Sequence, residues 1–130
     1  MHALRSPQEA YRRVEFDARV AGADPRQLVL VCYDQLTGAL GRAQHGARSG
    51  DNRLKSEALT RALAAIAALQ MGIDPAAPFA SVLNQFYGAA RRTLLDCVLD
   101  FDPQRVEALQ RDFSEVAGSL AKAVYASETD

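Results

Sequence analysis

Three Asp-Pro pairs, at residues 24–25, 74–75 and 102–103, divide this chain into helical lengths. Aspartate is a favoured helix N-cap, and proline suits the first helical position because its missing N–H would be unsatisfied there anyway. The pairs at 24 and 102 therefore predict helix starts. The pair at 74 is followed by Pro78, and each proline biases the residue before it away from the helical region. This stretch therefore predicts the end of one helix and a connection to the next.

Apolar residues recur between these signals at three- and four-residue intervals, as they do on one face of a helix. We predict four helices, at residues 25–47, 53–73, 79–99 and 103–126, with a tight turn around residues 49–52. One apolar stripe on each helix would face the core. In chain order the stripes are Leu28, Val29, Cys32, Tyr33, Leu36, Leu40 and Ala43; Leu59, Ala62, Leu63, Ile66, Leu69 and Ile73; Phe79, Leu83, Phe86, Ala90, Leu94 and Cys97; and Val106, Leu109, Phe113, Val116, Ala117, Leu120 and Val124.

Short connections between helices of this length favour an all-α fold, an antiparallel up-and-down four-helix bundle. At 130 residues the chain is long enough for one domain with a single core. We expect the bundle to span residues 23–126, with a short tail at 127–130. Residues 1–22 are more polar but carry Tyr11, Val14 and Ala18 at helical spacing. They would form a short N-terminal segment that docks on the bundle conditionally, the alternative being a frayed terminus.

The composition excludes several classes of protein. A net charge of −1 and basic pairs no longer than two residues give no general attraction for nucleic acid. No window has the ~18 uncharged apolar residues of a membrane span, and no apolar leader follows the N-terminus, so a cytoplasmic protein is expected. Cys32 and Cys97 fall on predicted core faces, which indicates buried, reduced thiols.

Sequence signals for chemistry are weak. His2 and His45 are not spaced with cysteines or carboxylates as a metal set, and no glycine-rich phosphate loop is present. We therefore expect neither a metal nor a cofactor. Arg91 and Arg92 could hold an anionic metabolite in a small helical-bundle enzyme, although exposed arginine pairs are usually solvated or ion-paired. That enzyme is one alternative function.

Three of the predicted helices carry more apolar surface than one core contact needs. Leu30 and Val31 fall outside the first stripe, and residues 62–73 contain no charge even on the face away from the core. A helix that is apolar all round is expected to be covered on both sides. The surplus predicts a groove along the outside of the bundle, suited to an amphipathic partner helix. Its predicted lining is Leu30, Val31, Ala64, Ala67, Met71, Gly88, Leu95 and Leu99, beside Thr60 and Ala68 on the back of the second helix. Another alternative is a homo-oligomeric structural adaptor, such as a homodimer that hides this groove.

Several short motifs occur in an order that points to one family. They are Ala10-Tyr11, then Asp24-Pro25-Arg26-Gln27-Leu28 followed by Cys32-Tyr33-Asp34, then Leu69-Gln70-Met71-Gly72-Ile73-Asp74, and finally Arg91-Arg92. Each motif alone is weak, but in this order and spacing the chain resembles the flagellin-specific export chaperones of the FliS family.

The resemblance implies a cytoplasmic four-helix chaperone rather than an enzyme. Its client would be the C-terminal region of flagellin, which is disordered in the monomer and helical in the filament. Holding that region would prevent premature polymerisation, and the complex would be delivered to the flagellar export apparatus. Tyr11 and its segment would occupy part of the groove when no client is bound.

Overall fold

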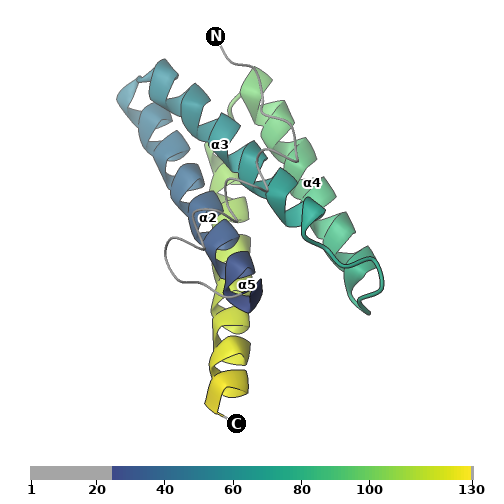
Figure 1. Ribbon diagram of the computed structural model, residues 1–130. Coiled ribbons are helices and arrows are strands. Elements are labelled where there is room, and N and C mark those ends of the chain that lie inside the picture. The colour runs from purple at the N-terminus through teal and green to yellow at the C-terminus, as the bar shows by residue number, and fades with distance from the viewer. Residues whose placement is uncertain (1–24, 130) are drawn as a thin grey trace.

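The computed structural model describes residues 25–129, and the side chains of residues 27–120. Four helices fill most of this range: α2 (Pro25–Ser49), α3 (Asn52–Met71), α4 (Ala80–Leu99) and α5 (Pro103–Thr129) (Figure 1). The predicted all-α fold is confirmed, and each helix starts within one residue of its predicted start. The segment 1–22, with Tyr11, lies outside the described residues. Among the described helices, none is long and apolar enough to cross a membrane.

A turn of two residues, Gly50 and Asp51, joins α2 to α3. Gly50 has a φ of 72°, a left-handed conformation that costs glycine little. The Asp51 carboxylate caps α3 by accepting a hydrogen bond of 3.0 Å from the Leu54 N–H. The Asp51 N–H donates to the carbonyl oxygen of Gly46 at 2.8 Å. These contacts turn the chain back, so that α3 runs antiparallel to α2.

The Asp-Pro pairs at 74–75 and 102–103 act as the sequence predicts. Asp74 lies in the connection between α3 and α4, where its carboxylate accepts a hydrogen bond of 2.9 Å from the Ala76 N–H. Asp102 precedes α5 and accepts from the Gln104 N–H at 3.0 Å, while Pro103 takes the first helical position. The pair at 74–75 therefore follows the end of α3, and the pair at 102–103 starts α5.

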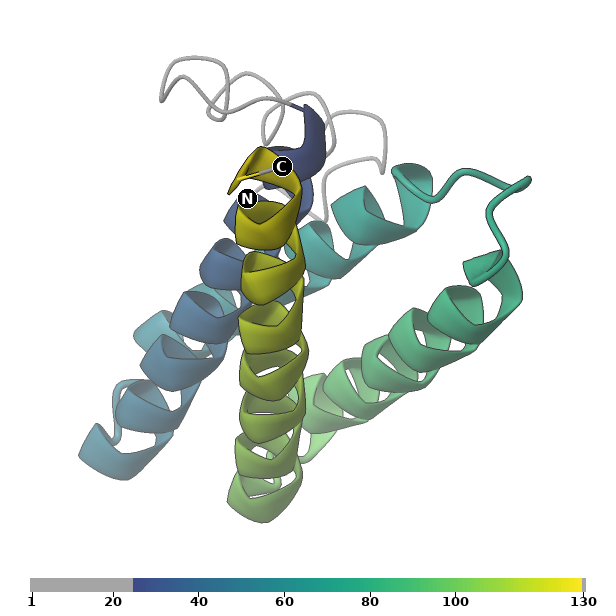
Figure 2. The ribbon, with the colours of Figure 1, turned by 90° about the horizontal axis from the view of Figure 1, so that it is seen from below.

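The four helices surround one core in chain order. α2 packs against α3 on one side and α5 on the other, α3 packs against α4, and α4 makes a smaller contact with α5. Successive helices run in opposite directions (Figure 1). Figure 2 shows α4 and α5 close together where residues 100–102 join them and far apart at their other ends. The bundle is therefore closed at one end and splayed at the other.

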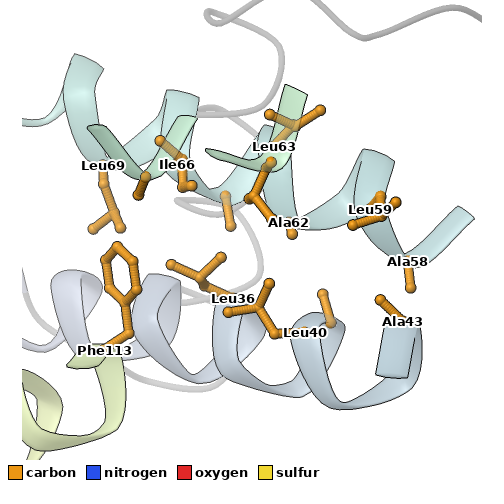
Figure 3. Packing of buried hydrophobic residues seen from close by; sticks show 14 of the residues in the cluster. Leu36, Leu40, Ala43, Ala58, Leu59, Ala62, Leu63, Ile66, Leu69 and Phe113 are labelled. Carbon is orange, nitrogen blue, oxygen red and sulfur yellow. The ribbon is translucent and has the colours of Figure 1, made fainter. Parts of the chain in front are cut away.

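The core is densest between α2 and α3, where small side chains let the helices approach. Ala43 and Ala58 lie opposite each other, and Leu36 and Leu40 face Ala62 and its neighbours (Figure 3). Most predicted core residues are buried. They are Cys32, Tyr33, Leu36, Leu40 and Ala43 in α2; Leu59, Ala62, Leu63, Ile66 and Leu69 in α3; Ala90, Leu94 and Cys97 in α4; and Val106 and Phe113 in α5.

Three positions differ from the sequence prediction. Phe79 precedes α4 instead of starting its core stripe, and its side chain is 69% exposed because the connection ends at this residue. Val29, in the second turn of α2, is 37% exposed. Ala68, expected on the outer face of α3, is buried because α3 packs against two helices and its covered face is wide.

Candidate functional site

The outward side of α3 is apolar in its C-terminal half. Ala64, Ala67 and Met71 follow one another at helical spacing opposite the buried stripe of this helix. Ala64 and Ala67 are half-buried, and Met71 is 45% exposed. No charged residue occurs in α3 beyond Arg61. These three side chains, called the α3 row below, form a low apolar strip where a surface helix ordinarily carries charge.

The two predicted site residues of α2 lie on different sides of that helix. Val31 lies about 60° around α2 from Gly46. Gly46 faces α3, since a Cβ atom on it would lie 2.7 Å from the backbone nitrogen of Lys55. Val31 is half-buried against the core and therefore borders α3. Leu30 shares a row with Thr37, whose carbonyl oxygen accepts a hydrogen bond from Gln110 of α5 at 3.3 Å. Leu30 therefore lies on the side of α2 that faces α5, away from the α3 row.

Gly88 and Leu95 lie on the edge of α4 nearest α3. The opposite edge is marked by Thr93 and Asp96, which contact Arg105 of α5 at 3.3 and 3.5 Å. Leu95 is about 200° around the helix from Thr93, and Gly88 is seven residues before Leu95 on the same row. Leu95 is half-buried against the core and Gly88 is half-buried. Both border the α3 row.

Leu99 lies away from the other predicted site residues. It is the last residue of α4 and is 90% exposed. The Lys55 ammonium lies 5.7 Å from the centre of the Phe101 ring, which fixes the closed end of the α3–α4 pair. Leu99 is therefore level with the charged N-terminal half of α3. Tyr11, the remaining predicted site residue, lies outside the described residues.

Sequence reasoning missed two exposed apolar side chains at the splayed end. Val82 of α4 is 64% exposed, and Phe79, discussed above, is exposed just before it. By its helical position Val82 lies on the row of Asp96, which faces α5. Met71 and Phe79 are therefore the exposed apolar side chains at the two ends of the connection between α3 and α4.

An aromatic cluster beneath this surface joins α2, α4 and α5. The hydroxyls of Tyr33 and Tyr87 form a buried hydrogen bond of 2.8 Å, and the Tyr33 and Phe113 ring centres are 5.5 Å apart. Phe86 packs on Phe113 with ring centres 4.7 Å apart. Sequence reasoning also missed Tyr87, which its predicted stripe skipped. The cluster sets the position of α4 relative to α2.

Burial makes the ionisable groups of this core chemically quiet. It raises the pKa of the Cys32 thiol to about 12, so the thiol stays protonated at neutral pH. Burial also raises the pKa of Tyr33, and the hydrogen bond with Tyr87 raises it further. The pKa of Tyr87 is raised mainly by burial. Cys32 and Cys97 are both free and buried, as predicted. None of these groups is a candidate nucleophile.

The arginine pair proposed for an enzyme does not line the hollow found among the described residues. Arg91 and Arg92 are exposed on α4. The hollow that the structure does contain measures about 490 Å³ and lies between α2 and α5, lined by Gln44, Arg48, Glu107, Gln110, Arg111, Ser114 and Glu115. Within residues 25–129, no three His, Cys, Asp or Glu side chains gather where they could hold a metal ion.

Known proteins resemble this chain over nearly its whole length. Residues 7–124 match the family model described as flagellar protein FliS. The flagellar secretion chaperone FliS of Salmonella typhimurium is 32% identical to it over 112 residues, which cover 84% of this chain and 83% of that protein. No solved structure matches. The family match includes all of α2, α3 and α4 and most of α5.

Proposed function

This chain belongs to the FliS family of flagellar secretion chaperones, and we propose that it holds the C-terminal region of flagellin before export. It is a chaperone and not an enzyme, as its family indicates. In the proposed cycle the chaperone binds newly made flagellin in the cytoplasm and keeps it from polymerising. It then presents the client to the flagellar export apparatus.

The apolar, uncharged outer side of α3 is the observation that carries this proposal. Small-molecule sites are concave and combine apolar walls with a few placed polar groups. The α3 row is instead a low strip about 10 Å long without polar side chains, which suits the apolar face of a partner helix. The strip borders half-buried side chains on both neighbouring helices, so one client helix could contact three helices at once.

The proposed contact surface follows the sequence prediction, with its centre now defined. The α3 row is the centre, Val31 borders it on α2, and Gly88 and Leu95 border it on α4. Leu30 and Leu99 would meet only a client that continues around α2 or toward the closed end of the bundle. Tyr11 would cover part of the surface while no client is bound.

Binding a disordered client requires enough buried surface to offset its loss of conformational freedom. Coupled folding of such a segment typically buries about 1,000–3,000 Å² and costs about 2–5 kcal/mol in ordering. The apolar half of α3 is about 15 Å long, so a client segment must continue from it onto α4 to reach that range. Holding the client needs no nucleotide or metal.

A calorimetric titration with the C-terminal segment of the organism's own flagellin tests this function. We expect one client segment per chaperone, and we expect Ala67→Glu to abolish the binding heat by placing a charge in the centre of the interface. Ala67 is half-buried but is not packed against the core, so thermal stability should change little. Ala64 does pack against the core, and Ala64→Glu is expected to reduce stability as well.

Ala89→Glu is the matched control, because Ala89 is an exposed helical alanine on the row of Asp96, which faces α5. It should bind like the wild type. Deleting residues 1–21 in the same titration shows whether the N-terminal segment competes with the client, in which case binding tightens. Absence of any complex at tens of micromolar, or equal binding by the Ala67 and Ala89 variants, would contradict the proposal.

A further inference from the structure

One end of the α3–α4 pair is almost free of charge. The 29 residues between Arg61 and Arg91 include one charged residue, Asp74. Its carboxylate is engaged inside its own loop by the hydrogen bond from the Ala76 N–H. The C-terminal half of α3, the connection and the α3-facing side of the first half of α4 therefore form what we call the charge-free corner, with Met71 and Phe79 exposed on it.

Four exposed arginines border this corner: Arg42 on α2, Arg61 on α3, and Arg91 and Arg92 on α4. We call them the arginine belt. No carboxylate of the described residues lies within 4.0 Å of any of them. Other arginines in the same helices and in α5 do have partners, since Arg53 pairs with Glu57 and Arg105 pairs with Asp96. Among the described residues, the belt is thus a row of cations without a directly paired carboxylate.

Arg42 and Arg61 lie at one height on the outer seam of α2 and α3. The close approach of Gly46 to Lys55 sets the register of this antiparallel pair. Arg42 is four residues before Gly46. The position opposite it in the antiparallel pair is four residues after Lys55, which is two residues before Arg61. Both side chains are exposed, so they lie on the outside of the seam.

Arg91 and Arg92 continue the belt on α4. The Lys55–Phe101 contact sets the register of α3 and α4 and brings Arg92 level with Ala64. Arg91 is about 200° from Thr93, the residue that contacts α5, and therefore lies on the edge nearest α3. The Arg92 guanidinium lies along the helix toward the corner, with Nη1 3.6 Å from where a Cβ of Gly88 would be.

Among the described residues, the carboxylates nearest to this belt are paired with other arginines: Glu57 pairs with Arg53 and Asp96 pairs with Arg105. Glu107, Asp112 and Glu115 are exposed on α5, whose backbone does not pack beside that of α3. The outer side of α2, α3 and α4 therefore presents an apolar area followed by unpaired positive charge. A ligand complementary to both parts must be apolar and uncharged in one stretch and anionic in the next.

We propose that the client segment is bipartite: an uncharged apolar stretch covers the charge-free corner, and carboxylates adjoining that stretch lie on the arginine belt. The inference rests on the proposed function, because it describes the client of that same surface. Guanidinium groups bind carboxylates with paired, charge-assisted hydrogen bonds, which also fix the direction and register of the bound segment. The carboxylates could come from aspartate and glutamate side chains or from the chain terminus of the client.

Replacing the belt tests the proposal in the intact chaperone. Titrated with the flagellin C-terminal segment, each of Arg42→Gln, Arg61→Gln, Arg91→Gln and Arg92→Gln should weaken binding about two- to fivefold at about 0.1 M salt. The quadruple variant should weaken it more than about tenfold. These losses should shrink at about 1 M salt, where exposed charges are screened. Arg48→Gln with Arg111→Gln is the control, since both line the hollow between α2 and α5.

Two altered client peptides distinguish the sources of the carboxylates. A peptide with its aspartates and glutamates changed to asparagine and glutamine loses the belt interaction if side chains supply it. A peptide with an amidated C-terminus loses it if the terminus supplies it. In either case the loss should be absent when the quadruple chaperone variant is used.

The outcomes separate this proposal from the function it rests on. Binding by the wild type that is unchanged in the quadruple variant at low salt would overturn the bipartite client and leave the chaperone function standing. No binding of flagellin by the wild type would overturn both. Because all four arginines are exposed, we expect every variant to remain folded, and circular dichroism checks this.

Discussion

Tyr33 and Tyr87 form the polar link at the centre of this molecule. Their hydroxyls are 2.8 Å apart and buried, and each is the other's partner. They join α2 to α4, two helices that otherwise do not pack against each other. A buried hydroxyl without a partner is costly, so the pair favours one arrangement of α4 over others that apolar packing alone would allow.

Removing one hydroxyl of this pair should cost more than half of the stability that is lost when both are removed. Tyr33→Phe and Tyr87→Phe each leave a buried hydroxyl unpaired, and each should lower the free energy of unfolding by about 1–3 kcal/mol. The double variant has no unpaired hydroxyl, so its loss should be smaller than the sum of the two. Urea denaturation followed by circular dichroism measures all three values. Additive losses would show that the hydrogen bond does not couple the two residues.

At the scale of the elements, α3 has two different faces. Its buried face contacts α2 and α4, and where it meets α2 the contact is made by small residues. The closest point is at Gly46, where an added Cβ would lie 2.7 Å from the Lys55 nitrogen and 3.0 Å from the Asp51 carbonyl oxygen. Backbone atoms cannot move aside as a side chain can, so this contact fixes how closely α2 and α3 approach.

Gly46→Ala should therefore destabilise the protein although alanine is the better helix former. We expect a loss of about 1–3 kcal/mol in the free energy of unfolding, because the two helices must separate. Gly118→Ala is the control: nothing lies within 4 Å of its added Cβ, and it should stabilise the protein by about 0.5–1 kcal/mol. Thermal unfolding of the two variants compares them directly. Equal effects would mean that the close approach does not limit packing.

The sequence was sufficient to predict the helices and most of the core, because caps, prolines and apolar spacing are local signals. It was insufficient where burial depends on a neighbour. Ala68 is covered only because α3 packs against two helices, and Tyr87 is buried because Tyr33 and Phe113 surround it. Phe79 fits the period of α4 but precedes its first turn.

The candidate site was predicted in the same uneven way. The absence of charge after Arg61 is visible in the sequence, and it identifies the α3 row correctly as outward-facing. The placement of Leu30 toward α5 depends on which side of α2 each neighbour occupies, and Thr37 and Gln110 reveal that only in the folded structure. A sequence shows how many surplus apolar residues a helix carries, but it does not show whether those residues join into one surface.

At the scale of the whole molecule, the bundle has a closed end and a splayed end. α4 and α5 meet around residues 100–102 and diverge from there (Figure 2). Met71 ends α3, Phe79 precedes α4 and Val82 lies in the first turn of α4, and all three are exposed near the end where α4 is far from α5. Local stability follows the number of buried contacts, so this end should open more readily than the α2–α3 pair.

Hydrogen exchange should display this gradient. We expect amide protons in residues 83–90 of α4 to exchange faster than those in residues 33–43 of α2 and 58–69 of α3, because the α2–α3 contact is the most extensive. Bound client should slow the α4 amides most. Mass spectrometry of peptic peptides, with and without the flagellin segment, provides the comparison. Uniform protection across the helices would contradict the gradient.

The accessibility of the two cysteines reports whether the whole molecule is correctly folded. Both thiols are free and enclosed in the core, one in α2 and one in α4, and the chain has no others. Two correctly folded copies therefore cannot become covalently linked through their native thiols. A dimer band on a non-reducing gel would mark material whose helices have come apart, and a cysteine introduced on the surface would be the one position open to a dye or spin label.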